Sequence, residues 1–258
     1  MNIKSNLLTA SFIAGSALAF SAGSAQAFSF QTPSDLGTCA NALPSLSCTT
    51  DDGFTITAGA LDPADPDEPL LVTKTVKGVT GIGVELGEEG SNSPTGEGVP
   101  DEIDADEYIL LESDKDKVFK YIELAFLFNP PAHGDEVKES AVLETAAGTG
   151  ILTVLNDTQA EYSFNGGPAV IIDALSDSTK QGAGYYQILN PFGEAKVGSV
   201  KFLAAGDDPD ADHSQHDYSL VAAEALPHHD IPEPATLGAL GLVAGALAAT
   251  RRGKKQAS

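Results

Sequence analysis

Carboxylates at regular spacing are the residues of this 258-residue chain that point most directly to chemistry. Asp208, Asp210 and Asp212 alternate along one short segment, and His213 follows the last of them. In a loop, this spacing directs several hard oxygen ligands at one Ca²⁺ ion. The segment departs from the EF-hand template, because His213 stands where that loop needs a glycine. An irregular Ca²⁺ site and a solvated acidic loop are therefore the two interpretations, and no other cofactor is indicated.

Two further acidic clusters leave the same alternatives open. They comprise Asp62, Asp65, Asp67 and Glu68 in one segment and Asp101, Glu102, Asp104 and Asp106 in another. A transition-metal site would need His213 and His216 together with Asp212 or Asp217. His228 and His229 are more typical of a linker, because they precede the C-terminal segment.

Signatures of common catalytic centres are absent from the sequence. It contains no His-Glu-x-x-His, Gly-x-Ser-x-Gly or Gly-Lys-Ser/Thr motif. Paired carboxylates would suit glycoside hydrolysis, but the chain has no Trp to stack on a sugar ring. Tyr185 and Tyr186 would be substitutes, although neighbours on a strand point to opposite faces, so at least one should be in the core. We therefore expect a protein that is not an enzyme.

The elements that position these groups are expected to be short strands. Apolar and β-branched runs recur every 8–12 residues or so between Gly, Pro, Asn and Asp, which is typical of a sandwich or barrel. The expected strands are 54–58, 70–76, 81–86, 107–113, 118–128, 141–145, 151–155, 160–164, 169–174, 185–189, 197–204 and 218–224. The fold class is therefore all-β, an antiparallel, jelly-roll-like β-sandwich that occupies residues 28–226 as one domain.

The body between the two ends is strongly acidic and contains two cysteines. The whole chain has a net charge of −23, and the body alone, without the two ends, is close to −27. Such a charge repels nucleic acid and anionic lipid and favours cationic partners. Cys39 and Cys48 are the only two cysteines, and in an exported protein a disulfide between them is expected.

The N-terminus has the three parts of a secretory signal peptide, residues 1–27. Lys4 is the positive start, residues 7–20 are apolar, and Ala25 and Ala27 form a small-residue cleavage site. Signal peptidase is therefore an expected partner, and the mature chain would begin at Phe28.

The C-terminal segment, residues 227–258, has the layout of a sorting tail. After a linker come Pro232, Glu233 and Pro234, then the uncharged run 235–250, and then Arg251 and Arg252. Sixteen helical residues extend about 24 Å, short of the ~30 Å hydrocarbon core. The run would therefore form a single short transmembrane helix, with its basic end in the cytoplasm.

This order of segments resembles the PEP-CTERM class of exported bacterial proteins. The resemblance implies recognition by an exosortase at the inner membrane, transient insertion there, and release to the cell surface or an exopolysaccharide matrix. The body also resembles a β-rich type within that class. The matching stretches are Gly81-Ile82-Gly83-Val84, Glu102-Ile103-Asp104, Glu107-Tyr108-Ile109 and Asp217-Tyr218-Ser219-Leu220.

The class has no shared activity, so the function expected is that of a surface or extracellular-matrix protein associated with exopolysaccharide. A Ca²⁺-dependent glycan-binding or adhesive module is the alternative, and a polysaccharide hydrolase is a third. Nucleic acid is not an expected partner.

Overall fold

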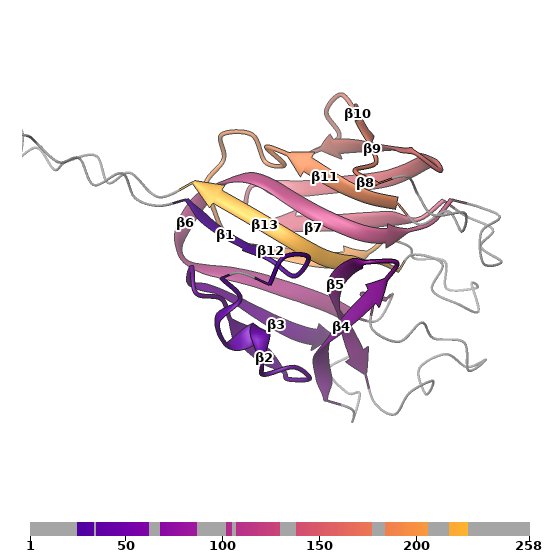
Figure 1. Cartoon of the computed structure of the whole chain (residues 1–258). Helices are drawn as coiled ribbons and strands as arrows, with labels where there is room; N and C mark the ends of the chain where they lie inside the picture. Colours follow the sequence, from indigo (N-terminus) through magenta and orange to yellow (C-terminus); the bar gives the residue numbers. More distant parts are fainter. Residues whose placement is uncertain are drawn as a thin grey trace, which may run out of the picture.

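The computed structural model describes residues 25–33, 35–61, 68–86, 102–104, 107–129, 138–176, 184–205 and 217–226. These residues form two antiparallel sheets packed face to face, as predicted for a β-sandwich (Figure 1). One short 3₁₀ helix, η1 (Gly37–Ala40), lies beside them. The predicted signal cleavage residue Ala25 is described, whereas the tail residues Pro232, Glu233, Pro234, Arg251 and Arg252 lie outside the described residues.

Sheet A is built around the last strand of the body. Its strands are β1 (Gln26–Ser29), β4 (Pro69–Val76), β5 (Val79–Leu86), β11 (Gly184–Leu189), β13 (Ser219–Leu226) and the second half of β6 (Glu107–Leu127). β13 pairs with β6 along one edge and with β5 and β1 along the other. β11 and β4 lie at the two margins of the sheet.

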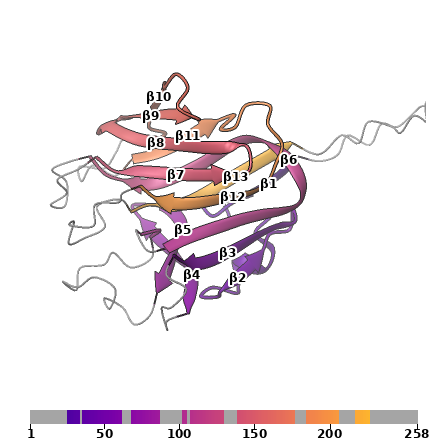
Figure 2. The same cartoon turned by 180° about the vertical axis from the view of Figure 1, so that it is seen from behind.

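Sheet B covers the opposite side of the core, with β7, β12 and β6 in the foreground of Figure 2. It consists of β2 (Ser47–Thr49), β3 (Phe54–Ala60), β7 (Ser140–Thr145), β8 (Gly148–Asn156), β9 (Gln159–Phe164), β10 (Val170–Asp173), β12 (Val197–Ala204) and the first half of β6. The strand order from one margin is β10-β9-β8-β7-β12-β6, and β3 and then β2 follow on the far side of β6.

β6 joins the two sheets and corrects one sequence prediction. Two strands were expected here, separated by the charged stretch 114–117, but a single strand of 21 residues runs through it. Asp114, Lys115 and Asp116 are exposed, while Lys117 turns inward. Its ammonium lies 3.2 Å from Asp114 Oδ1 and 5.7 Å from the centre of the Phe54 ring. The charges therefore stay solvated or paired along a strand that bends from one sheet into the other.

Aromatic side chains fill the space between the sheets. Phe54 and Phe119 meet with ring centres 6.0 Å apart, and Phe28 and Phe192 extend this contact on either side. All four side chains are buried. Each ring buries roughly 150–250 Å² of surface, so these phenylalanines supply much of the apolar burial that holds the sandwich together.

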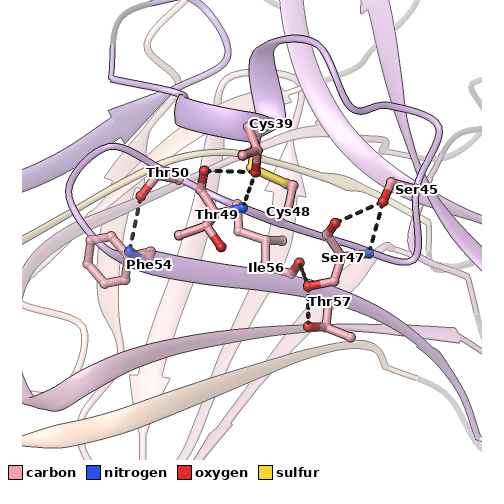
Figure 3. Close-up of a disulfide and its surroundings, with 10 residues drawn as sticks. Cys39, Ser45, Ser47, Cys48, Thr49, Thr50, Phe54, Ile56 and Thr57 are labelled. Carbon is pink, nitrogen blue, oxygen red and sulfur yellow. Dashed lines mark hydrogen bonds between the residues drawn. A yellow bond between two sulfur atoms is a disulfide. The ribbon is translucent and has the colours of Figure 1, made fainter.

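A disulfide ties η1 to β2, as the cysteine content predicted (Figure 3). Cys39 and Cys48 are both buried against the core. Thr38 Oγ1 accepts a hydrogen bond from Thr49 N at 2.7 Å, so the two arms of the loop are also joined beside the bridge. The disulfide thus fixes the segment before β3 onto sheet B.

The predicted strands agree with the observed ones to within a few residues, and two short strands were missed. β2 is only three residues long and lies directly after the disulfide loop. β1 was missed because its first residues were assigned to the signal peptide. The peptide bond between Ala27 and Phe28, the predicted cleavage site, lies inside β1, where Phe28 is paired with Ala223 and buried.

Candidate functional site

Two groups of polar side chains stand out, and the first is buried at one end of sheet A. Lys74 is on β4, and Glu102 is on the short segment 102–104. Val84 N donates to Glu102 O at 3.1 Å, and Ile103 N donates to Tyr218 O at 2.7 Å. The segment is therefore held between the end of β5 and the start of β13. Three of the stretches that resembled the β-rich type, around Gly83, Ile103 and Tyr218, meet here.

The carboxyl of Glu102 is fully buried beside an ammonium. Lys74 Nζ lies 2.9 Å from Glu102 Oε1, although neither oxygen of this carboxyl makes a well-directed hydrogen bond. Asp217, also buried, faces the same carboxyl. A carboxyl removed from water, beside one ammonium and a second carboxyl, is favoured in its protonated form when loss of hydration outweighs the attraction of the ammonium.

The pKa of Glu102 reflects this balance. Burial raises it from 4.5 to about 7, and the charge of Asp104 adds to the rise. Lys74 and Asp217 act in the opposite direction. Loss of hydration therefore outweighs the attraction of the ammonium, and the carboxyl keeps its proton to near neutral pH.

A β-bulge brings an aromatic ring to this site. Phe126 has a φ of 69°, and the pairing between β11 and β6 skips it, because Gly184 is opposite Leu127 and Tyr185 is opposite Ala125. A bulge of this kind re-aims a side chain. The Phe126 ring consequently leaves the main core and lies 5.7 Å from Lys74 Nζ. The simple alternation expected from Ile122 to Phe128 is broken at this residue.

The second group lies on the outer face of sheet A, and we call it the tyrosine face: Tyr121, Glu123, Tyr185 and Gln187. Gln187 is directly opposite Glu123, and Tyr185 is opposite Ala125, so these side chains project from the same side of the sheet. Tyr185 donates its hydroxyl hydrogen to Glu123 Oε2, and Gln187 Nε2 donates to Glu123 Oε1 at 2.7 Å. The carboxylate is thus held in place from two directions.

The tyrosine face is partly open to solvent. Its four side chains are half-buried. Burial and the hydrogen bond to Glu123 raise the pKa of the Tyr185 hydroxyl well above its usual range, so it remains a donor. Tyr186, by contrast, is buried in the core, which confirms that only one of the two adjacent tyrosines faces outward. Phenol rings beside a fixed carboxylate and amide provide both a stacking surface and hydrogen-bonding groups.

The predicted metal ligands are only partly within the described structure. The residues outside the described ranges are Asp208, Asp210 and Asp212, the histidines His213, His216, His228 and His229, and, of the second acidic cluster, Asp62, Asp65 and Asp67. Of the third cluster, Glu102 and Asp104 are described and Asp101 and Asp106 are not. Among the described residues, no group of three or more His, Cys, Asp or Glu is arranged to hold a metal ion.

The sequence analysis singled out Glu102 and Asp217 but not Lys74, which pairs with Glu102. Of the tyrosine face it singled out Tyr185 alone. Lys74 is 28 residues away from Glu102 and lies in an ordinary strand pattern. The residues Tyr121 and Glu123 alternate with the core positions of β6, and that alternation was the available signal that they share a face.

Comparison with models of protein families identifies how this chain is sorted. Residues 230–253 match the model of the PEP-CTERM protein-sorting motif. The chain carries a PEP-CTERM sorting motif. The match includes every predicted motif residue, from Pro232, Glu233 and Pro234 to Arg251 and Arg252. Comparisons with curated proteins and with solved structures gave no match.

A PEP-CTERM motif indicates an exported protein that an exosortase sorts to the cell surface. The motif covers the end of the chain only, so the body has no counterpart in these comparisons. No helix within the described residues is long and apolar enough to cross a membrane.

Proposed function

We propose that this PEP-CTERM protein is a surface or extracellular-matrix component that associates with exopolysaccharide and has no catalytic activity. The sorting motif at residues 230–253 is the observation that carries the proposal. The disulfide and the large negative charge support it, because both suit a soluble body in an oxidising exterior. In this proposal, signal peptidase cuts after Ala27, the tail is inserted transiently in the inner membrane, and exosortase processing then releases the body.

The tyrosine face supports glycan binding as the more specific form of this function. Tyr121 and Tyr185 offer ring surface, while Glu123 and Gln187 offer fixed acceptors and donors for sugar hydroxyls. Tyr is less favoured than Trp for stacking on a sugar, so the affinity of one such face is modest, and many copies on a polymer would add avidity. Ca²⁺ at Asp208, Asp210 and Asp212 would make this binding chelator-sensitive.

A hydrolase is the less favoured alternative, and burial is the reason. Burial raises the pKa of Glu102, and Asp217 faces it, yet the exposed fractions of these residues are 1% and 6%. A polymer cannot reach them without local unfolding. Their buried position suits residues that hold the segment 102–104 in place better than it suits a general acid and a general base.

The test is cosedimentation of the purified protein with exopolysaccharide isolated from the producing cells, with and without a chelator. We expect the wild type to sediment with the polymer and the double variant Tyr121→Ala/Tyr185→Ala to stay in solution. Tyr108→Ala is the matched control, because it removes a half-buried tyrosine from sheet B. Equal sedimentation of all three proteins would reject the tyrosine face, and no sedimentation of the wild type would reject the polysaccharide association.

A further inference from the structure

An apolar groove lies between β10 of sheet B and β11 of sheet A, and it borders the tyrosine face at Gln187, which belongs to both. Its volume is about 510 Å³, and Tyr162 and Phe164 form part of its lining. Four aliphatic side chains in it are more than half exposed, namely Val170 at 62%, Ile171 at 52%, Leu175 at 52% and Leu189 at 64%. Exposed aliphatic side chains gathered in one place on a highly charged protein indicate a binding surface.

The walls of the groove are strand edges whose backbone groups point into it. Ala174 N donates to Thr158 O on the β9 side, so by alternation the N–H and C=O groups of Ile171 and Asp173 point the other way, towards β11. Asn190 N donates to Lys120 O on the β6 side, so the backbone groups of Gln187 and Leu189 point towards β10. β10 and β11 form no ladder with each other in the described part of the chain.

One hydrogen bond shows how the groove is closed at one end. Leu175 N donates to Tyr185 O at 2.7 Å, which joins the two edges just after β10 and at the start of β11. From this point the strands diverge, and the apolar side chains line the gap. Among the described residues, Asp173 is the only charged residue in the lining, and Gln159 Nε2 donates to its Oδ1 at 2.9 Å, so the described part of this edge carries little of the charge that usually protects an edge strand.

We propose that this groove binds an extended peptide from another protein, which adds as a strand to the free edge of β10 and places alternating aliphatic side chains between β10 and β11. Backbone pairing supplies affinity, and the aliphatic lining selects the side chains. Because the chain carries a net charge of −23, the peptide is neutral or basic rather than acidic.

A second copy of the chain does not fit as well. Two such bodies repel each other through their negative charge. Pairing of two four-residue edges would also bury far less than the roughly 800 Å² per partner of a stable dimer. A small apolar molecule would fill the groove but leave the backbone groups of Ile171 and Leu189 without partners.

The test is fluorescence anisotropy with a labelled peptide, Lys-Ile-Thr-Val-Thr-Ile-Lys, titrated with the purified protein. Ile171→Pro removes the one N–H of that residue without breaking the β9 ladder, and Leu189→Lys places a charge in the groove. We expect each to weaken binding about tenfold or more. Ile151→Lys is the matched control, because Ile151 is an exposed aliphatic residue on β8, outside the groove, and it should bind as the wild type does.

A second peptide with the same side chains but N-methylated backbone amides separates strand addition from simple apolar binding. We expect it not to bind. Binding of the methylated peptide at equal strength would show that only side chains are recognised, and no binding of either peptide would show that the groove is not a peptide site. A dimer in sedimentation velocity that Leu189→Lys dissociates would assign the groove to a second copy. Each of these three results overturns the proposal, whereas polysaccharide binding is tested separately by the cosedimentation of the wild type and the Tyr121→Ala/Tyr185→Ala variant.

Discussion

Lys74 and Glu102 face each other at the end of sheet A, with the ammonium nitrogen 2.9 Å from a carboxyl oxygen that solvent does not reach. The pair links β4 to the segment 102–104, which also hydrogen-bonds with Val84 and Tyr218. The strength of the contact between Lys74 and Glu102 depends on whether the Glu102 carboxyl carries a proton. That dependence gives the first prediction.

The stability of the body should fall as the pH rises from about 4.5 to about 7. In this range folded Glu102, whose pKa is about 7, keeps a proton that the unfolded chain, with a pKa of 4.5, releases. The folded state binds more protons, so the free energy of unfolding decreases with pH, by about 3 kcal/mol at most, and levels off above pH 7. Urea unfolding of wild type and Glu102→Gln at several pH values measures this. The variant should lose the slope, whereas Glu112→Gln, at an exposed site, should keep it.

Removing the disulfide should destabilise the body without changing its fold. Closing the loop between Cys39 and Cys48, nine positions apart, lowers the entropy of the unfolded chain, which is worth about 2–3 kcal/mol. The double variant Cys39→Ser/Cys48→Ser should therefore unfold at lower urea concentration with an unchanged far-ultraviolet spectrum. Wild-type protein treated with a reductant is the internal reference, and a midpoint that differs from the variant's would contradict this account.

Gly59 and Tyr108 should show strong energetic coupling. A Cβ at position 59 would lie 2.1 Å from the Tyr108 ring, which also has Lys201 Nζ 4.0 Å from its centre. Gly59→Ala should cost about 1–3 kcal/mol of unfolding free energy, because the ring must move. In Tyr108→Ala protein the same substitution should cost much less. A double-mutant cycle of unfolding free energies from urea denaturation gives the coupling energy. Additive changes in free energy would show that the Tyr108 ring moves aside at no cost.

Loss of the Pro-Glu-Pro motif should prevent maturation. In the producing bacterium we expect the wild-type exported form to lack the segment after about residue 230, because an exosortase recognises the motif. The triple variant Pro232→Ala/Glu233→Ala/Pro234→Ala should retain the tail and remain with the membrane fraction. Intact mass and cell fractionation measure both outcomes. A variant with the wild-type mass would mean that these three residues are dispensable.

Much of the sandwich was predictable because its strands alternate with a period of two between clear turn residues. Phe54 and Ile56 on β3, and Val200 and Phe202 on β12, are core residues as that pattern indicates. The pattern failed where the backbone itself departs from regular pairing. The bulge at Phe126 reverses which side its ring takes, and the continuous strand through Asp114 to Lys117 depends on a bend between sheets that local sequence does not specify.

The buried site was predictable only in part. An acidic cluster around Glu102 was visible, but burial of one carboxyl beside Lys74 depends on pairing between segments that are distant in the sequence. The groove between β10 and β11 was not predictable, because it arises from two sheet margins that approach each other and then diverge.

The pairing of β13 with β6 on one side and with β1 and β5 on the other also has a mechanical consequence. β13 is the last described strand before the sorting motif, and a force applied to its C-terminal end along the strand axis would act on it directly. Its hydrogen bonds to both neighbours are then loaded in shear and must yield together, rather than opening one at a time as a peeled edge strand would. A body pulled in this way is held by a strand with partners on both sides, which should slow forced unfolding.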